Sequence, residues 1–481
     1  MQRRQDSKPY RTDEVSDAIR TRGPNYCPES MFVSHDGQVT GDDEMPSLRE
    51  AGDDAISLMR QLIQIDTTNT GDPDTTAGEA LAAEFVESAL QEVGYAPERF
   101  ETSSASRQGV QLRIPGRDPD RGALLLHGHL DVVPAHPDEW SVPPFEALEQ
   151  DGMIWGRGAV DMKDMDAMLL ATVRNWARTG HVPPRDIILM FTPDEEAGGW
   201  QGAHWITQNR PELLEGATEG VGEVGGFSVT VDQKRIYFVQ TAEKGIAWLE
   251  LLAEGTAGHG SFLNDDNAVA AVSAAIVAIA DQEWPITLTE TTKALLHELA
   301  DILDVRWDGK DPTPLINALG PVSRIVGATM RNTANPTMLK GSPKVNVIPG
   351  SATAGVDCRF IPGSEQHLLD TIDGLLPPGV TRSFVHRDVA LETTFDGPTI
   401  AAMERALKAE DPGAHTVPYM LSGGTDAKAW TGHGLRCYGF APLRLPPDLD
   451  FASMFHGVDE RVPIDAVKFG VRVLHRFLDD V

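Results

Sequence analysis

The sequence predicts an α/β protein with a mostly parallel sheet, into which a smaller α+β domain is inserted. Short apolar runs that end in polar residues, at 122–127 and 186–192, alternate with amphipathic segments at 78–92 and 163–178. Strands and helices that alternate in this way build parallel sheets covered by helices on both faces. The chain has 481 residues, which is more than one hydrophobic core usually serves, so we expect two domains.

The order of the expected elements changes after residue 243 and changes back near residue 391. Between these points we expect strands and helices in a different order, with strands at 247–254, 352–360 and 381–388 and helices at 266–281 and 365–374. We therefore predict an α/β domain made of 51–242 and 391–481 and an inserted domain at 243–390. Residues 1–50 are polar and lack periodicity, which is typical of a weakly structured arm. The chain ends in an amphipathic segment, 464–479.

The charge balance excludes some classes of partner. The chain has 72 acidic and 41 basic side chains and a net charge of −31, and such a surface repels the phosphates of nucleic acids. No apolar run approaches the roughly 18 residues that a membrane helix needs, and the N-terminus lacks the apolar stretch of a secretory signal. Cys27, Cys358 and Cys437 are too few and too scattered for a disulfide scaffold or a CxxC metal site. We therefore expect a cytoplasmic protein without a membrane or nucleic-acid partner.

Two of the expected buried strands end in side chains that can bind a metal ion or move a proton. After the first, His129 and Asp131 are two residues apart, so on an extended segment both side chains point the same way. A carboxylate near the second ring nitrogen of a histidine ligand is common in metal sites, although a satisfied surface histidine is the ordinary alternative. After the second, Asp194, Glu195 and Glu196 are three consecutive acids, which are costly to gather without a cation. An exposed acidic turn is the alternative there.

Other candidate positions are weak signals when each is taken alone. Asp161 follows a Gly-x-Gly pair and precedes a helix, so it could simply cap that helix. The glycine spacing matches neither of the common phosphate-binding loops. Glu223 lies between glycines, and His456 lies in a glycine-containing loop before the last helix. Ser422 lacks the GxSxG order of a nucleophile elbow, so we expect no serine nucleophile.

Taken together, these motifs resemble the M20 family of metallopeptidases and amidohydrolases. That family includes carboxypeptidases, dipeptidases, aminoacylases, acetylornithine deacetylase and succinyl-diaminopimelate desuccinylase. The resemblance runs from about residue 53 to the C-terminus and rests on the order and spacing of His129-x-Asp131, Gly156-x-Gly158-x-x-Asp161, Glu195-Glu196, Glu223 and His456. It implies a zinc-hydrolase catalytic domain with an inserted lid and dimerisation domain, and a homodimer.

The resemblance also implies a site for two divalent metal ions, with Zn²⁺ expected and Co²⁺ or Mn²⁺ as alternatives. Asp161 would bridge the two ions. His129 and Glu223 would complete one metal site, and Glu196 and His456 would complete the other. Three carboxylates and two neutral imidazoles can hold two such cations and leave room for a water molecule between them.

The catalytic roles follow from the same resemblance. Asp131 would orient His129, and Glu195 would be the general base. The metal ions would lower the pKa of the water, Glu195 would take its proton, and the hydroxide would attack the amide carbonyl. Glu195 would then pass the proton to the leaving nitrogen.

The inserted domain and one loop of the α/β domain contain further matches. Gly258-His259-Gly260-Ser261 resembles the family's lid motif, in which the histidine reaches the active site of a neighbouring subunit. Asn346 and Arg359 resemble substrate-holding positions, and a guanidinium can grip a carboxylate with two hydrogen bonds. Gly424 matches a glycine whose backbone contacts that carboxylate. Without the resemblance, a turn histidine, a capping asparagine and a sheet-edge ion pair would be the ordinary interpretations.

The chain departs from the family pattern at two places. The family usually has Gly or Pro directly after the acid at the Glu223 position, whereas Val224 stands here, which makes Glu219 an alternative ligand. The segment 282–344, with Trp284, Trp307 and Met338, is longer than in the small deacetylases and is more similar to the larger carboxypeptidase and N-acyl amino acid hydrolase members.

The expected function is hydrolysis of amide bonds in peptides or N-acyl amino acids that have a free carboxylate. One alternative is a narrow biosynthetic deacylase of the acetylornithine or succinyl-diaminopimelate type. Another is a metal-binding protein that has lost catalysis. Such a protein would not need a base, and the presence of Glu195 therefore argues against it.

Overall fold

The computed structural model describes residues 46–481. Helix α1 (Pro46–Gln64) opens this part of the chain, and its buried face begins at Leu48. Residues 46–50 therefore belong to a helix, which corrects the predicted end of the N-terminal arm. Proline suits the first turn because its φ is already helical and its missing N–H would have no partner there. The rest of the predicted arm, 1–45, lies outside the described residues.

A ten-stranded sheet carries the main hydrophobic core. Its strands run in the order β1-β2-β6-β3-β7-β18-β9-β16, and β8 and β17 also pair with β9. The run β6-β3-β7-β18 is parallel, as is the pair β9 and β17, whereas the remaining pairs are antiparallel. The predicted α/β class with a mostly parallel central sheet is confirmed. The strands are β1 (Glu98–Glu101), β2 (Gln108–Ile114), β3 (Ala123–His129), β6 (Ile187–Thr192), β7 (Ala217–Gly222), β8 (Ser228–Val231), β9 (Lys234–Glu243), β16 (Leu391–Glu392), β17 (Ala414–Leu421) and β18 (Arg436–Gly439).

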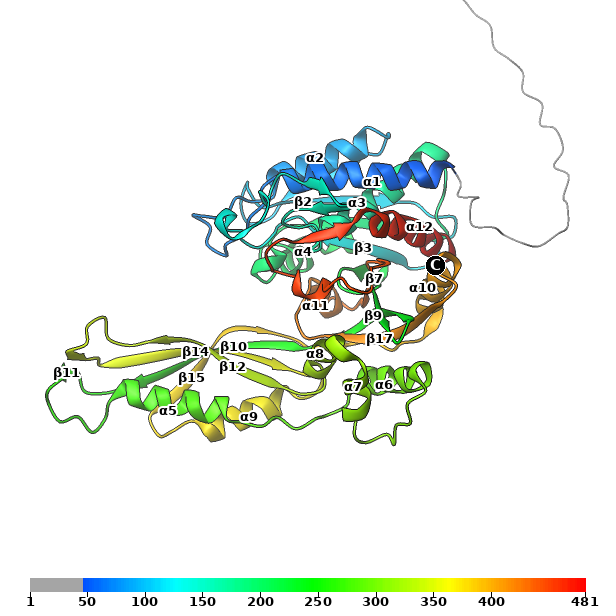
Figure 1. Cartoon of the computed structure of the whole chain (residues 1–481). Coiled ribbons are helices and arrows are strands. Elements are labelled where there is room, and N and C mark those ends of the chain that lie inside the picture. The colour runs from blue at the N-terminus through cyan, green and yellow to red at the C-terminus, as the bar shows by residue number, and fades with distance from the viewer. Residues whose placement is uncertain (1–45) are drawn as a thin grey trace, which may run out of the picture. The chain divides into compact units, whose positions relative to one another are not determined.

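Helices cover both faces of this sheet, as Figure 1 shows. Leu124 and Leu126 of β3 point into the core under α1, α2, α3 and α12, whereas Leu125 between them points into a second cluster under α4 and α11. Because side chains alternate along a strand, a strand buried on both faces is apolar throughout, which is why its sequence shows no alternation. The helices are α2 (Ala80–Gln91), α3 (Lys163–Thr179), α4 (Ala203–Asn209), α10 (Gly397–Glu410), α11 (Ala427–Gly432) and α12 (Ile464–Asp480).

The inserted segment contains a separate four-stranded antiparallel sheet in the order β12-β14-β10-β15. One face of this sheet packs against α5 and α9 and forms a core of its own, with Leu249, Val356 and Ile279 among its buried residues. A short pair, β11 and β13, accompanies this sheet. The bounds are β10 (Gly245–Glu254), β11 (Gly258–His259), β12 (Thr333–Lys340), β13 (Val347–Ile348), β14 (Ser351–Phe360), β15 (Val380–Asp388), α5 (Ala268–Ala280) and α9 (Glu365–Leu375).

Part of the predicted inserted domain packs on the main core instead. Helix α6 (Glu290–Leu303) lies against β9 and β17, and its residues Leu295 and Leu299 are fully buried in the main cluster. The helices α7 (Thr313–Ala318) and α8 (Ser323–Ala328) follow it and also contribute to that cluster. The segment 243–390 therefore contains an antiparallel sheet with its own core and, in addition, three helices that pack on the α/β domain. The precise division into domains remains a prediction.

Smaller elements join the loops of the α/β domain. The sheet of β4 (Leu148–Gln150), β5 (Met153–Trp155) and β19 (Arg461–Pro463) places the chain after His456 beside the chain before Asp161. Four short 3-10 helices lie in the same domain, at Pro137–Glu139, Glu195–Ala197, Pro211–Leu214 and Phe451–Ser453, and another, Gly320–Val322, precedes α8.

Two further observations concern the described residues as a group. Cys358 and Cys437 are buried free thiols in two different clusters, and Cys27 lies outside the described part of the chain. Among residues 46–481, no helix is both long and apolar enough to cross a membrane.

Candidate metal centre

Four of the predicted site residues meet because three neighbouring parallel strands end at the same edge of the main sheet. His129 is the last residue of β3 and is paired with Thr192, the last residue of β6. Glu195 and Glu196 follow β6, and Glu223 follows β7 on the other side of β3. The carboxyl ends of parallel strands are where ligands collect in open α/β sheets.

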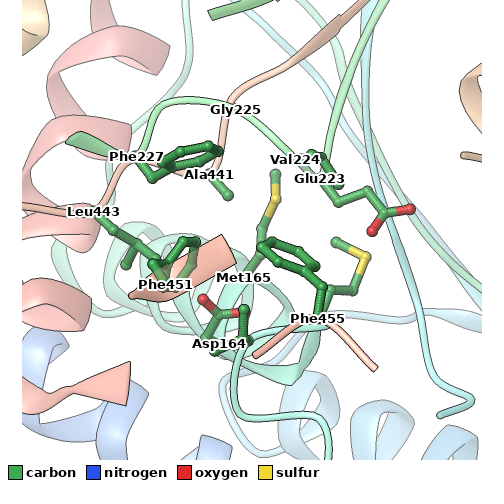
Figure 2. Close-up of a pocket in the computed structure, with 12 residues that line it drawn as sticks. Asp164, Met165, Glu223, Val224, Gly225, Phe227, Ala441, Leu443, Phe451 and Phe455 are labelled. Atoms are coloured by element: carbon green, nitrogen blue, oxygen red, sulfur yellow. The ribbon is translucent and has the colours of Figure 1, made fainter. Parts of the chain in front are cut away.

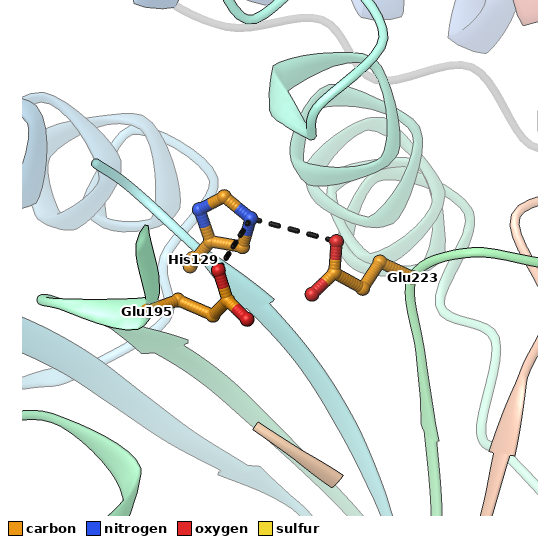
Figure 3. Close-up of side chains that lie close together, drawn as sticks. All are labelled: His129, Glu195 and Glu223. Carbon is orange, nitrogen blue, oxygen red and sulfur yellow. Dashed lines mark ion pairs between the residues drawn. The ribbon is translucent and has the colours of Figure 1, made fainter. Parts of the chain in front are cut away.

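The imidazole of His129 is the centre of the first group. Its Nε2 atom lies 3.1 Å from Asp161 Oδ1, 3.5 Å from Glu223 Oε2 and 3.8 Å from Glu195 Oε2. Figure 3 shows the Glu195 and Glu223 carboxylates facing this one ring nitrogen. The other ring nitrogen, Nδ1, lies 3.0 Å from the backbone carbonyl oxygen of Asp131. A proton on Nδ1 would leave the Nε2 lone pair directed at the carboxylates, which is the tautomer that a metal ligand requires.

The second group is built around His456. Its Nε2 atom lies 3.0 Å from Glu196 Oε2 and 3.4 Å from Asp161 Oδ2. Asp161 therefore presents one oxygen to each of the two imidazoles, His129 and His456. A carboxylate between two such groups has the arrangement that a bridging ligand needs.

The donor atoms are suitable for divalent cations. Ligand atoms of His129, Glu195 and Glu223 lie within 4.8 Å of one another, as do those of His129, Asp161 and Glu196. The second oxygen of Glu196, Oε1, is buried and has no hydrogen-bond partner. Imidazole nitrogens and carboxylate oxygens are common ligands of zinc and related ions. Glu195, at 3.8 Å from His129 Nε2, is almost as close to this nitrogen as Glu223 is.

The crowding of these acids shifts their pKa values. Burial raises the pKa of Glu223 to about 8, and burial together with the charge of Glu223 raises the pKa of Glu195 well above its usual range. Burial opposes ionisation of Asp161 too, but its hydrogen bonds with the two histidines lower its pKa. Hydrogen bonds to Asp161 and Glu196 raise the pKa of His456 to about 10. A divalent cation binding here would take the place of these protons, because metal ligands must be deprotonated.

Asp131 holds the acidic loop as well as the histidine. Its carboxylate accepts the backbone N–H groups of Glu195 (3.0 Å) and Glu196 (3.1 Å) and the side-chain amide of Asn69 (2.8 Å). The nearest contact from Asp131 to the His129 ring is made by its backbone carbonyl, and the carboxylate lies 3.6 Å from Nδ1. Asp131 therefore fixes the position of the two glutamates relative to His129.

Glu460 is a supporting residue that sequence reasoning missed. One oxygen of its buried carboxylate accepts the backbone N–H groups of Val160 (2.6 Å) and Asp161 (3.0 Å), and the other accepts that of Gly158 (3.0 Å). The second oxygen also pairs with Arg157 at 2.7 Å. Glu460 thus ties the loop before Asp161 to the loop that carries His456. No motif marks a residue whose partners are backbone groups, and only its position four residues after His456 could have drawn attention to it.

Asn69 and Asp426 also support the centre and were not predicted. Asn69 donates to Asp194 (3.2 Å) as well as to Asp131, and the buried Arg107 pairs with Asp194 at 3.0 Å. Asp426 accepts a hydrogen bond from Thr192 at 2.6 Å, directly behind the loop of acids. These contacts connect the centre to segments that are distant in sequence.

Glu219, the alternative ligand, belongs to another network. Its carboxylate pairs with Arg185 (2.6 Å) and Arg436 (2.9 Å) and accepts a hydrogen bond from Thr399 (2.7 Å). Its partner on β3 is Leu124, near the start of that strand, whereas His129, Glu195 and Glu223 lie at or after strand ends. Glu219 therefore lies outside the group of candidate ligands, although Val224 does follow Glu223.

One apolar cavity adjoins the Glu223 side of the centre. Figure 2 shows its lining, in which Phe227, Phe451, Phe455 and Met165 surround the buried Asp164. Burial raises the pKa of Asp164 well above its usual value, and one of its oxygens has no hydrogen-bond partner. Glu223 lines the same cavity and is buried there, and this burial is the main physical cause of its raised pKa.

The predicted substrate-binding residues fall into two places. Arg359 in β14 and Gly424 lie where the inserted sheet meets the α/β domain: a Cβ on Gly424 would stand 3.0 Å from Ile246 Cδ1, and Ile246 is paired with Arg359. Arg359 donates from Nε and Nη2 to Asp357 at 2.7 and 3.2 Å. Beneath Gly424, the buried Lys428 donates to the carbonyl oxygens of Lys244 and Val389, both at 2.7 Å.

His259 and Asn346 lie together elsewhere in the inserted domain. Both are exposed, and the N–H of Gly260 donates to the carbonyl of Asn346 at 2.9 Å. Within residues 46–481, neither has a hydrogen bond or ion pair with the candidate metal ligands His129, Asp161, Glu196, Glu223 and His456. The roles predicted for both remain predictions.

Comparison with known proteins places the chain in a family. Residues 125–480 match the model of Peptidase family M20/M25/M40. The chain is 29% identical over 422 residues to aminoacylase-1 of Sus scrofa. This alignment covers 86% of this chain and 92% of the aminoacylase. The di-peptidase Dug1p of Saccharomyces cerevisiae has the same fold, with a TM-score of 0.69 and 16% sequence identity. The match covers 90% of this chain and 97% of Dug1p. The YXEP protein of Bacillus subtilis, a dinuclear metal-binding peptidase, also has this fold, with a TM-score of 0.57 and 13% sequence identity. The match covers 90% of this chain and 100% of YXEP. With its strand-end cluster and this match over most of its length, the chain belongs to Peptidase family M20/M25/M40 and is a hydrolase.

Proposed function

We propose that this hydrolase cleaves amide bonds in peptides or N-acyl amino acids that have a free carboxylate, with two divalent metal ions, expected to be Zn²⁺. The observation that carries the proposal is the position of Asp161, whose two oxygens face His129 and His456 within a cluster of buried acids. The similarity to an aminoacylase and to a di-peptidase supports the substrate class, and the similarity to a dinuclear peptidase supports the number of ions.

The proposed ligands fall into two sets that share Asp161. His129 and Glu223 would complete one set, since His129 Nε2 lies 3.1 Å from Asp161 Oδ1 and 3.5 Å from Glu223 Oε2. Glu196 and His456 would complete the other, because His456 Nε2 is within 3.4 Å of both acids. Bound cations would supply an activated water molecule and would polarise the scissile carbonyl.

Glu195 is the proposed proton carrier. Its carboxylate lies 3.8 Å from His129 Nε2, and the hydrogen bond from its backbone N–H to Asp131 holds the residue in place. Glu195 would receive a proton from the attacking water and deliver it to the leaving nitrogen, so that the amine departs neutral.

Arg359 and Gly424 are proposed to hold the substrate carboxylate. The guanidinium has N–H groups on the edge that Asp357 does not occupy, and these suit a carboxylate. His259 and Asn346 are proposed to reach the site of a second copy of the chain in a homodimer, because they lie apart from the metal centre of their own chain. In a two-fold dimer each site would borrow these residues from its partner.

A metal count combined with a hydrolysis screen tests the proposal. We expect two equivalents of zinc per chain by elemental analysis and release of free amino acid from N-acetyl amino acids or dipeptides. Amides that lack a free carboxylate are the matched control and should be cleaved much more slowly. Two bound metal ions with no turnover on either substrate class would refute the proposed activity, and less than one ion per chain would refute the two-metal centre.

A further inference from the structure

The uncovered face of the inserted sheet presents a row of side chains next to Arg359. Residues that are paired in neighbouring antiparallel strands have their side chains on the same face. Asp357 of β14 is paired with Trp248 of β10, and Trp248 is paired with His386 of β15. Arg359 lies two residues beyond Asp357 and so shares this face, while α5 and α9 cover the opposite one.

Aromatic rings continue this row to the loop of catalytic acids. The Trp248 and His386 rings are 4.9 Å apart between centroids, and Trp200 meets His386 edge-on at 5.9 Å. The indole N–H of Trp200 donates to His386 Nδ1 at 3.3 Å, and Trp200 stacks on His204 at 4.4 Å. We call Trp200, His204, Trp248 and His386 the aromatic wall. Trp200 follows Glu196 by only four residues, so the wall extends from the substrate-carboxylate side to the metal side.

Both tryptophans of the wall remain open to solvent. Trp200 is 47% exposed and Trp248 is 41% exposed. Large apolar surface that is shared by neighbouring residues and borders a charged group is typical of a ligand-binding surface. The neighbouring charge is the guanidinium of Arg359, which indicates a ligand that has a carboxylate beside an apolar group.

We propose that the aromatic wall binds the side chain of the amino acid whose carboxylate Arg359 holds, and that it selects aromatic and large apolar side chains. This inference rests on the proposed function and deepens it. In an amino acid, the side chain and the carboxylate are attached to the same carbon, so a side-chain site must lie directly beside the carboxylate site. Trp248 meets this requirement, because neighbouring strands are about 4.8 Å apart and Asp357, the partner of Arg359, stands opposite it. Aromatic substrate rings would gain edge-on or offset contacts with the indoles.

The aromatic wall also joins the two domains, and this structural role is the main alternative to a role in binding the substrate side chain. His204 lies 3.2 Å from Asp388 of β15, and Trp200 is bonded to His386 on the same strand. A role limited to holding the domains together would change turnover equally for all substrates. A side-chain site would change the ratio between substrates with large and small side chains.

The test measures kcat/KM of the zinc-loaded enzyme for N-acetyl-L-phenylalanine and N-acetylglycine. We expect Trp200→Ala and Trp248→Ala each to lower the phenylalanine-to-glycine ratio by about 10-fold, the size of effect that lost contacts in an apolar site produce. Trp248→Phe should retain most of the ratio, because it keeps a ring. The matched control is Phe384→Ala, since Phe384 is as exposed as Trp248 and lies on β15, but its ring packs against Arg382 and Arg387. This control should leave the ratio unchanged.

The outcomes separate this inference from the proposed function. Equal losses on both substrates, or an unchanged ratio in both alanine variants, would overturn the side-chain site while the proposed function stands. If the wild type cleaves no N-acetyl amino acid and no dipeptide, the proposed function fails. The side-chain site is then tested by calorimetry, which compares the affinity of the protein for L-phenylalanine with its affinity for glycine. Preferential binding of phenylalanine that Trp248→Ala abolishes would support it, and equal binding would refute it.

Discussion

Replacing Glu460 by glutamine should weaken the metal centre even though Glu460 does not touch a metal ligand's side chain. The carboxylate accepts hydrogen bonds from three backbone N–H groups and from Arg157. An amide has only one accepting oxygen, and its NH₂ group would face donors, so at least one buried N–H group would lose its partner. The loop before Asp161 should then move away from the His456 loop.

The expected loss of stability follows from the same contacts. A buried donor left without a partner costs about 1–3 kcal/mol, and loss of one partner from a buried ion pair costs about 3–5 kcal/mol. These effects overlap because they share one carboxylate, so we expect a total of about 3–5 kcal/mol. Supporting residues of a metal site typically change its affinity by about 10-fold to 100-fold, and we expect a loss of zinc affinity in that range.

Urea unfolding with a chelator present gives the stability of the metal-free protein, and a zinc titration gives the affinity. Glu219→Gln is the matched control, because Glu219 is an equally buried carboxylate with several partners in a network away from the metal centre. It should lower stability similarly but leave zinc affinity unchanged. If Glu460→Gln binds zinc as tightly as the wild type, the reasoning about loop positioning is wrong. If both variants lose zinc affinity equally, the effect is general destabilisation and not a property of the Glu460 contacts.

The remaining predictions concern the centre, the substrate grip, the dimer and one buried lysine. Glu195→Ala should keep both metal ions but lose several orders of magnitude in turnover, whereas Asp161→Ala should lose metal. Elemental analysis that shows metal loss in Glu195→Ala and metal retention in Asp161→Ala would contradict the assignment of Glu195 as base and Asp161 as bridge. Arg359→Ala should remove most of the preference for a substrate with a free carboxylate over its amide, and Arg359→Lys should retain only part of that preference. A wild type that cleaves acid and amide equally well would refute the role of Arg359 in binding the substrate carboxylate. An equal mixture of His259→Ala and Glu195→Ala chains should recover about a quarter of wild-type activity if exchange is complete, because about half of the dimers are mixed and each of these has one good site of two. No recovery after demonstrated exchange would show that His259 does not act across the dimer. Burial lowers the pKa of Lys244 to about 7, so between pH 7 and about 10.4 the unfolded chain binds more protons than the folded one and stability rises with pH. Urea unfolding should show the wild type gaining stability relative to Lys244→Met by up to about 1.4 kcal/mol per pH unit over this range, and parallel pH profiles would refute it.

The main-sheet elements were predictable because their sequence patterns are local. The apolar run before His129 and the one before Asp194 could only be buried strands, and parallel strands end at one edge. The convergence of His129 with Glu195 therefore follows from topology, whereas no strand was predicted before Glu223, and its place in the site depended on the family resemblance. His456 and Asp161 come from loops, and their meeting depended on the family resemblance.

Other features could not be predicted, for identifiable physical reasons. The amphipathic pattern of α6 shows which side is apolar but not which core receives it, so Leu295 and Leu299 were assigned to the inserted domain although they pack on the main one. Glu460 and Asn69 bind backbone groups or acids that are distant in the chain, and such contacts leave no periodicity in the sequence. Glu219 was considered as a ligand because Val224 follows Glu223, and its arginine partners, Arg185 and Arg436, could not be foreseen because only folding brings them to it.

Lys428 has a mechanical consequence for the inserted domain. The chain enters the inserted sheet at Lys244 and leaves it near Val389, and a single buried ammonium group binds the carbonyl oxygens of both. A swing of the inserted sheet about this connection would have its axis close to the ammonium, because the first and last crossings of the chain between the two sheets are both fastened there. Points near an axis travel least, and Gly424 lies directly against the Lys428 side chain. The part of the site proposed to hold the substrate carboxylate would thus keep its shape through such a swing, while the distant end carrying His259 would travel farthest.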